Sequence, residues 1–124
     1  MGYRDEFDDL AVLTEESLAG FSIADVVRVE GEQVLLTLDG ERFRGRRAFS
    51  CLVVPRAGDT VSVVSDGRGS HYVTAILERA EPGEMELFSQ GPMSIRSAGH
   101  VRVVAATELD LEARERIRLR SPVL

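Results

Sequence analysis

The sequence predicts an all-β protein made of a small barrel and a repeat-built β-helix shared between three chains. Over residues 21–80, short segments with alternating apolar residues are separated by turns rich in Gly, Asp and Pro. From Met85 to Ser121 the sequence instead repeats with a period of eight, without an insertion or deletion. A helical period of 3.6 fits neither part. The chain therefore divides into a compact β domain and a β-structured appendage.

Residues 1–20 precede the predicted strands and form an acidic N-terminal arm. Six acidic side chains face one basic side chain here, and they account for most of the net charge of −6. The apolar residues that could share one face of a helix are Phe7, Leu10, Ala11 and Leu18, with Gly20 as its end. A solvated arm is the preferred interpretation. A short docking segment for a basic partner is the alternative.

Residues 21–80 predict about five strands without a substantial helix. The candidate segments are residues 23–30, 33–39, 41–50, 51–54, 60–65 and 71–79. The turn signals between them are Gly31-Glu32, Asp39-Gly40, the loop from Pro55 to Asp59, and Asp66 to Gly69. Phe43, Gly45 and Phe49 are expected to mark breaks or bends in segment 41–50. Short strands with tight turns favour a small barrel of the OB type, and a small open sandwich is the alternative.

Glu81-Pro82-Gly83 separates the barrel from five octads, which span residues 84–121. Each octad has two apolar residues two positions apart, a small residue two positions later, and three linking residues. The apolar residues are Met85, Leu87, Met93, Ile95, Val101, Val103, Leu109, Leu111, Ile117 and Leu119. The small ones are Ser89, Ser97, Ala105, Ala113 and Ser121. A spacing of two places each apolar pair on one face of an extended strand.

An octad is too short to form one coil of a single-chain β-solenoid. Two architectures remain, a meander of short hairpins packed on the rest of the chain, and a prism of three identical chains. The second is favoured, because threefold closure buries the apolar pairs and leaves no lateral sheet edge. The ten apolar residues would then form the core of a homotrimer.

Charged residues that alternate with the apolar pairs are expected to point outward from this core. They form a basic band at Arg102, an acidic band at Asp110 and Glu112, and a second basic band at Arg118 and Arg120. Neighbouring chains could pair across these bands and help to set their register. Exposed pairs contribute only about 0–1 kcal/mol each, so the bands would add specificity more than stability.

Composition excludes several classes of protein. The chain has no long apolar run that would predict a transmembrane helix, and its acidic start does not resemble a signal peptide. The single Cys51 cannot form an intrachain disulfide, which fits a reducing, cytoplasmic compartment. Beyond the arm the charges are nearly balanced, so a bulk nucleic-acid surface is not favoured.

No catalytic, cofactor or metal site is predicted, and the protein is expected not to be an enzyme. His71 and His100 have no Cys or His partner at metal-ligand spacing. Cys51 precedes an apolar segment and is interpreted as a buried, inert thiol. Gly67 and Gly69 lack the following helix and Lys that a phosphate-binding loop requires.

One cluster offers a rival interpretation. Arg42, Arg44, Arg46 and Arg47 are interleaved with Phe43 and Phe49. Arginines and aromatic rings on an OB-type face can bind single-stranded nucleic acid through phosphate pairing and base stacking. A solvated outer strand face or an interchain contact is preferred, because the acidic total opposes nucleic-acid binding.

Three features in this order resemble a known family. They are Ser50-Cys51-Leu52-Val53-Val54-Pro55 with Gly58-Asp59, the segment Tyr72 to Arg79, and the octads. Over about residues 25–121 the chain resembles a domain-of-unknown-function family found beside type VI secretion genes. It is similar, more distantly, to VgrG proteins and phage central spikes, in which an OB-fold domain precedes a trimeric β-helix.

The resemblance implies a non-enzymatic, homotrimeric, spike-like component or effector-loading adaptor of a contractile injection apparatus. Its partners would be other apparatus proteins or effectors, and the assembly could be exported with the apparatus. The chain is short for a spike protein and stops at Pro122-Val123-Leu124 while the octads still run. It also lacks the large receptor-binding domains of VgrG. These departures favour an accessory or adaptor role over membrane piercing.

Overall fold

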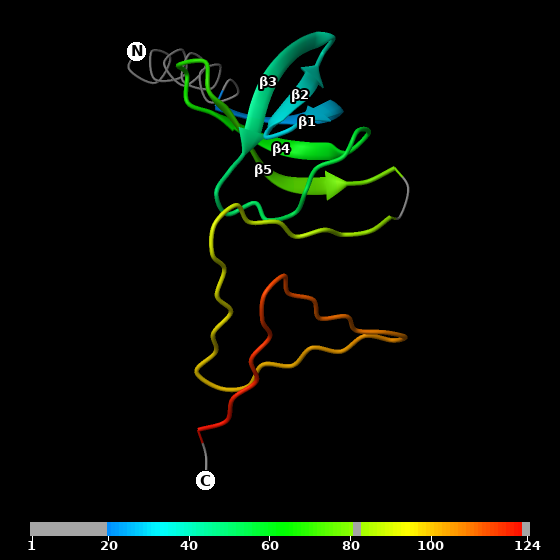
Figure 1. Ribbon diagram of the computed structural model, residues 1–124. Helices are drawn as coiled ribbons and strands as arrows, with labels where there is room; N and C mark the ends of the chain where they lie inside the picture. Colours follow the sequence, from blue (N-terminus) through cyan, green and yellow to red (C-terminus); the bar gives the residue numbers. More distant parts are fainter. Residues whose placement is uncertain (1–19, 81–82, 123–124) are drawn as a thin grey trace, which may run out of the picture. The chain divides into compact units, whose positions relative to one another are not determined.

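The computed structural model describes residues 20–80 and 83–122, so all of the predicted acidic arm except Gly20 lies outside the described residues. Figure 1 shows five strands in the first of these ranges. The strands are β1 (Phe21–Glu30), β2 (Gln33–Leu38), β3 (Glu41–Arg47), β4 (Thr60–Ser65) and β5 (His71–Glu78). Five of the six predicted segments therefore become strands, with small differences at their ends.

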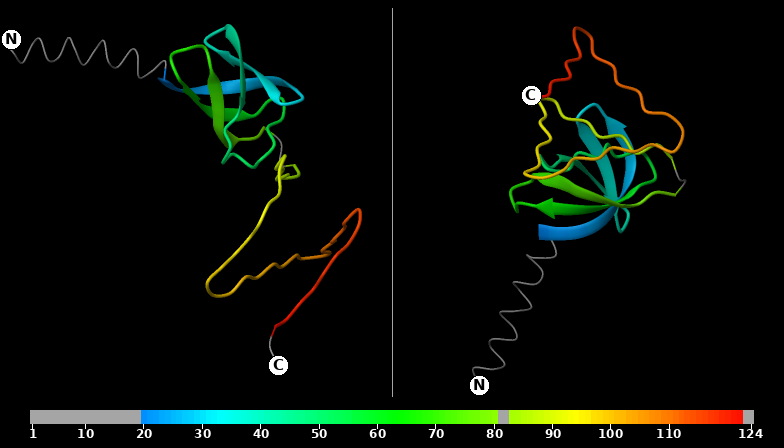
Figure 2. Two further views of the ribbon diagram at one scale, coloured as in Figure 1. Left: turned by 60° about the vertical axis from the view of Figure 1, so that its left-hand side comes forward. Right: turned by 90° about the horizontal axis from the view of Figure 1, so that it is seen from below.

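The five strands close into a barrel with the order β1-β2-β3-β5-β4. Neighbouring strands run antiparallel except β3 and β5, which pair in parallel through Arg46 with Tyr72 and Arg47 with Val73. Figure 2 shows the strands wrapping around one another from two further sides. The all-β, OB-like barrel predicted from the sequence is confirmed, and the closed order replaces the open sandwich considered as its alternative.

The predicted hairpin turns have the backbone geometry that their residues favour. Gly31 has φ of 62°, which closes the β1–β2 hairpin. Asp39 (φ 51°) and Gly40 (φ 83°) both adopt the left-handed conformation between β2 and β3. Two successive residues with positive φ match the twist of the flanking strands, and Asp-Gly is a preferred sequence for such a turn.

Alternate residues of the strands point into the barrel and form its core. The strand residues of this core are Ala24, Val26, Val34, Leu36, Val61, Val63 and Val73, and Cys51 joins them from the loop after β3. Leu36, Val61, Val63 and Val73 are completely buried. Period-two burial of β-branched residues is what a closed sheet with one inner face requires.

Segments 41–50 and 51–54 differ from the sequence prediction. β3 passes through Gly45 without a break, and Gly45 pairs with Val34. A side chain at position 45 would be crowded, because a Cβ there would lie 3.0 Å from the His71 carbonyl oxygen. Phe43 packs against the core. Segment 51–54 does not form a strand, although Val53 makes an isolated antiparallel bridge to Leu87.

The chain divides into two compact units at Pro92 and Met93. The described part of the second unit, residues 93–122, is extended chain with bends at residues 98–99, 106–107 and 114–115. A further bend at residues 90–91 ends the first unit. Figures 1 and 2 show straight runs and corners within the second unit. Successive bends are eight residues apart, so the backbone follows the period of the sequence.

No strand pairing or buried residue occurs within residues 93–122, so the described octads do not form the meander of hairpins considered above. Each bend follows the small residue of its octad. At Ser97 the side chain helps to form the bend, because its hydroxyl accepts a hydrogen bond from the Gly99 N–H at 3.1 Å. No helix in the described part of the chain is long and apolar enough to cross a membrane.

Candidate functional site: the arginine-clamped first octad

The first octad lies along the loop that follows β3 and is held there by main-chain hydrogen bonds. The Val54 N–H donates to the Glu86 carbonyl oxygen, and the Phe88 N–H donates to the Leu52 carbonyl oxygen, both at 2.9 Å. Together with the bridge between Val53 and Leu87, these bonds make residues 86–88 a short antiparallel addition to residues 52–54. The barrel thus fixes where the repeats begin.

A buried ion pair supports this arrangement from one side. Arg79, just after β5, donates from Nε to Asp59 Oδ1 at 2.8 Å and from Nη2 to Asp59 Oδ2 at 2.9 Å. Asp59 is completely buried. The hydrogen bonds from Arg79 are the main cause that lowers the pKa of Asp59 from its ordinary value, and the backbone N–H of Arg56 also contributes. Asp59 is therefore ionised and Arg79 is held in a single orientation.

The same guanidinium reaches both of the paired segments. Its Nη2 donates to the Val54 carbonyl oxygen at 3.1 Å, and its Nη1 donates to the Glu84 carbonyl oxygen at 2.9 Å. Arg79 therefore connects the loop after β3 to Glu84, at the start of the first octad. We call Arg79 with Asp59 the first clamp.

The loop that presents Asp59 is fixed to β1. Gly58 adopts a φ of 90°, which favours glycine, and its N–H donates to the Val26 carbonyl oxygen at 2.8 Å. The Val26 N–H in turn donates to the Asp59 carbonyl oxygen at 2.8 Å. The Gly-Asp dipeptide noted in the sequence thus positions the carboxylate for the clamp.

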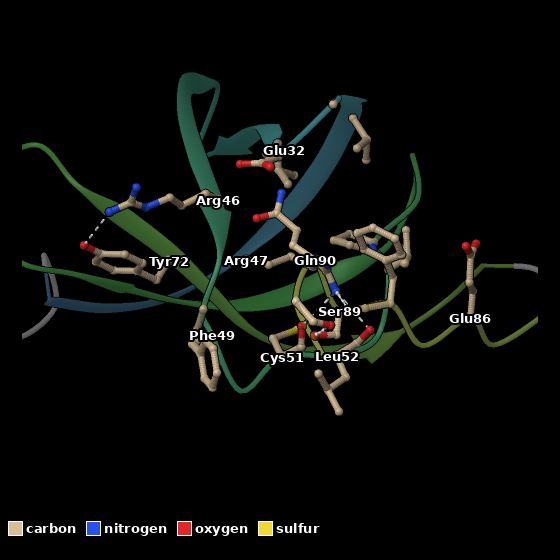
Figure 3. A pocket seen from close by; sticks show the side chains of 18 residues that line it. Glu32, Arg46, Arg47, Phe49, Cys51, Leu52, Tyr72, Glu86, Ser89 and Gln90 are labelled. Carbon is tan, nitrogen blue, oxygen red and sulfur yellow. Dashed lines mark hydrogen bonds between the residues drawn. The ribbon is translucent and has the colours of Figure 1, made fainter. Parts of the chain in front are cut away.

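Arg47, the last residue of β3, forms the second clamp. Its Nη1 contacts three carbonyl oxygens, those of Cys51 at 3.0 Å, Leu52 at 2.9 Å and Phe88 at 3.1 Å. Its guanidinium carbon also lies 5.7 Å from the centre of the Phe88 ring, within the range of a cation–π contact. Figure 3 shows Arg47 directed toward Ser89, Cys51 and Leu52. Arg47 therefore connects the end of β3 to Phe88, in the middle of the first octad.

An open pocket of about 850 Å³ lies beside the second clamp. It is lined by the end of β3, the loop after it, the β1–β2 turn and residues 86–91 of the first octad. Arg46 and Tyr72 lie together at one side of it, where Arg46 Nη2 donates to the Tyr72 hydroxyl at 3.2 Å (Figure 3). The guanidinium carbon of Arg46 lies 5.1 Å from the Tyr72 ring centre. Phe49 is fully exposed at the pocket edge.

The arginine row predicted on segment 41–50 is divided by the strand. Arg42, Arg44 and Arg46 are exposed, whereas Arg47 is half-buried in the second clamp. Arg44 pairs with Glu30 at 2.7 Å and donates to Gln33 at 3.2 Å. The two phenylalanines are likewise separated, since Phe43 packs against the core while Phe49 is exposed. The row does not form one continuous surface of cations and stacking rings.

The ten apolar residues predicted as a trimer core are all exposed in the single chain. Their exposed fractions range from 48% at Met93 to 88% at Leu119. No backbone hydrogen bond to another backbone group is formed within the described residues 93–122. Over the described residues 93–122, the apolar side chains are thus exposed and the main chain has no backbone partner, although the Gly99 N–H donates to the Ser97 hydroxyl.

Other singled-out residues have structural surroundings. His71 Nδ1 lies 2.5 Å from the Ser65 hydroxyl, and its ring centre is 4.7 Å from that of Phe43. His100 is exposed in the second unit. Burial raises the pKa of the Cys51 thiol, which keeps it protonated. The described ranges contain no group of three or more potential metal ligands.

Sequence reasoning missed both clamps and the pocket. Arg79 and Asp59 are twenty residues apart, and Arg47 bonds to carbonyl groups, which carry no sequence signal. The one available hint was the Gly58-Asp59 dipeptide, which predicts a turn that presents a carboxylate but does not indicate the partner of that carboxylate.

Residues 24–124 match the model of a family described as "Protein of unknown function (DUF3540)", and the chain therefore belongs to that family. No curated protein and no solved structure matches the chain.

Proposed function

We propose that this member of the DUF3540 family is a non-enzymatic, homotrimeric structural protein. In this proposal the barrel of each chain is a mount, and the octads of three chains wind into a short β-helix. The core of that β-helix consists of the ten apolar residues named above. The observation that carries the proposal is that backbone bends recur every eight residues, one in each of the first four octads, and that the apolar pairs of all five octads are exposed.

Contacts within a single chain do not stabilise these straight runs and bends. A straight run with two apolar residues on one face and a corner after a small residue buries nothing by itself. The exposed main-chain groups of the single chain have water as a partner, but they would need protein partners once the apolar pairs were buried, since nearly all buried main-chain groups in folded proteins are paired. Two further copies of the chain would bury the apolar pairs and provide main-chain partners. Each apolar pair would then face its equivalents in the other two chains across a common axis.

The two clamps support the role of the barrel as a mount. In a three-chain β-helix, the three chains must run in the same direction and begin at the same position along the common axis. Arg79 and Arg47 hold the start and the middle of the first octad through the carbonyl oxygens of Glu84 and Phe88. An arginine that bonds to the main chain fixes position regardless of the side chains that the octad carries.

We further propose that the trimer serves a type VI or similar contractile injection apparatus as a spike-like component or effector-loading adaptor. The support is the resemblance described above, namely a small barrel followed by octads in the order found in spike proteins. The OB-like barrel agrees with that order. The partners would be other apparatus proteins or effectors.

Light scattering coupled to gel filtration tests the assembly directly. The full chain at micromolar concentration should have three times the mass of 13.6 kDa, about 41 kDa. A mass of one chain would overturn the proposal, as would a dimer. Copurification from the native host with sheath, hub or effector proteins of an injection apparatus tests the second part. A stable trimer that copurifies with none of them would contradict the apparatus role alone.

The alternative function, single-stranded nucleic-acid binding through Arg42–Arg47, stays a prediction. No observation favours it specifically, because Arg44 already pairs with Glu30 of the barrel and Arg47 already donates to the Phe88 carbonyl oxygen of the first octad. Salt-dependent binding of an oligonucleotide that is lost on substitution of Arg42 and Arg46 would support it.

A further inference from the structure

The first octad has two different faces, and the open pocket lies on one of them. Its apolar pair, Met85 and Leu87, belongs to the proposed trimer core, and neither residue lines the pocket. Glu86 and Phe88 alternate with that pair along the extended segment, and both of them line the pocket. The pocket therefore lies on the face of the first octad that the proposed trimer leaves outside.

Phe88 departs from the repeat to which it belongs. The equivalent positions of the later octads hold Arg96, Val104, Glu112 and Arg120. An aromatic side chain thus occurs at this position in the octad that borders the pocket. The departure indicates a requirement of the pocket and not of the repeat.

Exposed apolar side chains from two other segments border the same pocket as Phe88. They are Val29 near the end of β1, and Phe49 and Leu52 in the loop after β3. Phe49 is fully exposed, and the other three are each more than one third exposed. A single exposed apolar residue is ordinary, but several around one hollow, with polar residues at its edge, form a contact surface.

A positive charge is held at one side of this apolar surface. The Arg46 guanidinium lies over the Tyr72 ring and donates to the Tyr72 hydroxyl (Figure 3). The ion pairs of the described residues use other arginines, so Arg46 has no carboxylate partner among residues 20–80 and 83–122. An arginine that a ring orients but no carboxylate neutralises is suited to a carboxylate from outside the chain, which it can bind through two parallel hydrogen bonds.

The acidic residues of the pocket decide between a peptide and a nucleic acid as its ligand. Glu32 in the β1–β2 turn and Glu86 in the first octad line it together with Arg46 and Arg47. Arg47 is already bonded to three carbonyl oxygens, so a chain of phosphates would meet one available cation and two repelling carboxylates. Figure 3 shows Arg46 and Glu86 on opposite sides of the pocket. A ligand with a single carboxylate can therefore bind Arg46 without approaching Glu86.

The Gln90 side chain supplies a group that can recognise a peptide main chain. It lines the pocket beside the first octad (Figure 3), and an amide both donates and accepts hydrogen bonds. The pocket is open and has a volume of about 850 Å³, whereas sites for small molecules enclose most of the ligand surface. These features suit a length of extended chain better than a small molecule.

We infer that the pocket binds an extended peptide segment of a partner protein, in which an acidic residue lies two positions from an apolar one. That spacing places both side chains on one face of the peptide. The acidic side chain pairs with Arg46, the apolar side chain packs against Phe49 and Phe88, and the Gln90 amide bonds to the peptide main chain. The inference goes beyond the proposed mount and does not rest on the trimer, because every lining residue belongs to one chain.

Titration of the full chain with the peptide acetyl-Gly-Phe-Ser-Glu-Ser-Phe-Gly-amide tests the inference. The glutamate is its only charged residue, and the two phenylalanines allow either chain direction. Nuclear magnetic resonance should show saturable shifts of the amide groups of Phe49, Phe88 and Gln90. Replacing the glutamate of the peptide with glutamine should lower the affinity about tenfold, because a charge-assisted hydrogen-bond pair is lost. The absence of saturable shifts at millimolar peptide, or equal affinities of the two peptides, would overturn the inference.

Two matched pairs of variants locate the bound peptide. Arg46→Gln should weaken binding about tenfold, whereas Arg42→Gln, which removes an exposed arginine of β3 outside the pocket, should leave the affinity unchanged. Phe49→Ala should weaken binding about fivefold, and Phe21→Ala, which removes an exposed ring outside the pocket, is its control. Equal effects within either pair would refute the assigned site.

Two further measurements separate this inference from its rivals. A single-stranded oligothymidylate should give no saturable shifts at the pocket residues. If it binds more tightly than the peptide and Arg46→Gln abolishes that binding, the ligand is a nucleic acid and the inference fails. Light scattering on the same samples tests the trimer separately, since a monomer that binds the peptide at these residues would support this inference while contradicting the proposed function.

Discussion

The pair of substitutions Val103→Asp and Val104→Asp separates the proposed core of the β-helix from its surface. Val103 and Val104 are adjacent, carry the same side chain, and are 67% and 71% exposed in the single chain. They differ only in direction, because successive residues of an extended strand point to opposite faces. In the proposed trimer Val103 faces the axis and Val104 faces solvent.

The expected loss of assembly free energy for Val103→Asp is large. Full burial of a valine side chain is worth about 1.5–3 kcal/mol, and 67% of Val103 remains to be buried on assembly. This corresponds to roughly 1–2 kcal/mol per chain, or about 3–6 kcal/mol for three chains. Three carboxylates at a common axis add a desolvation cost of several kcal/mol each and repel one another. Since every 1.4 kcal/mol changes an equilibrium constant tenfold, a total above about 10 kcal/mol would lower the association constant of the trimer by about seven orders of magnitude.

Light scattering at micromolar concentration measures the outcome. Val103→Asp should have the mass of a monomer, while Val104→Asp should keep the mass of the wild-type assembly. Circular dichroism should show the barrel strands in both variants, since neither residue is in the barrel. If both variants assemble, or if Val104→Asp alone dissociates, the inward face has been assigned incorrectly and the reasoning fails.

Three further predictions concern the barrel and its clamps. Asp59→Asn should lower the free energy of unfolding by about 2 kcal/mol, because it replaces charge-assisted hydrogen bonds with neutral ones. Because the folded state lowers the pKa of Asp59 below 3.8, its contribution is complete above about pH 4 and is lost as the pH falls below that value. Thermal unfolding should therefore depend less on pH below 4 in Asp59→Asn than in the wild type, and equal acid sensitivity would contradict the ionised pair. Gly45→Ala should destabilise the barrel by about 1–3 kcal/mol, because the new methyl group would lie 3.0 Å from a backbone oxygen. Gly91→Ala, with open space around it, is the control in the same denaturant titration, and equal effects would refute the close approach. Arg47→Gln should accelerate amide hydrogen exchange at Phe88 by tenfold or more while leaving β2 protected, and unchanged exchange would show that the second clamp is dispensable.

The barrel could be predicted because its signals are local. Alternating apolar residues and turn residues such as Asp39-Gly40 each determine the conformation of a few residues around them. Closure of the barrel could not be predicted from local signals. It depends on the pairing of β3 with β5, which involves only two residues of each strand, and β4 separates these strands in the sequence. Gly45 illustrates the limit, since a glycine that relieves a close approach resembles in sequence a glycine that ends a strand.

The two clamps and the pocket were not predicted from the sequence. The octad period was visible in the sequence, and the backbone bends follow it. The arginine row was interpreted as one surface because its residues are neighbours in sequence. Strand geometry instead alternates their directions, so Arg46 reaches Tyr72 while Arg47 reaches main-chain oxygens of the first octad. Sequence proximity alone does not distinguish a binding patch from two unrelated contacts.

The clamps also bear on a difficulty that every exact repeat presents to an assembly. Three octad arrays could slip by one octad, eight residues, and still bury most of their apolar pairs, because each pair has nearly the same shape. The charge bands at Arg102, Asp110 and Glu112 penalise such a slip only weakly, since exposed pairs contribute little. A barrel that is clamped to the first octad penalises such a slip strongly. A chain that slipped by one octad would also move its barrel along the trimer axis, away from the position of the other two barrels. In the proposed trimer, Arg47 and Arg79 therefore act as determinants of register, although neither residue belongs to the repeat.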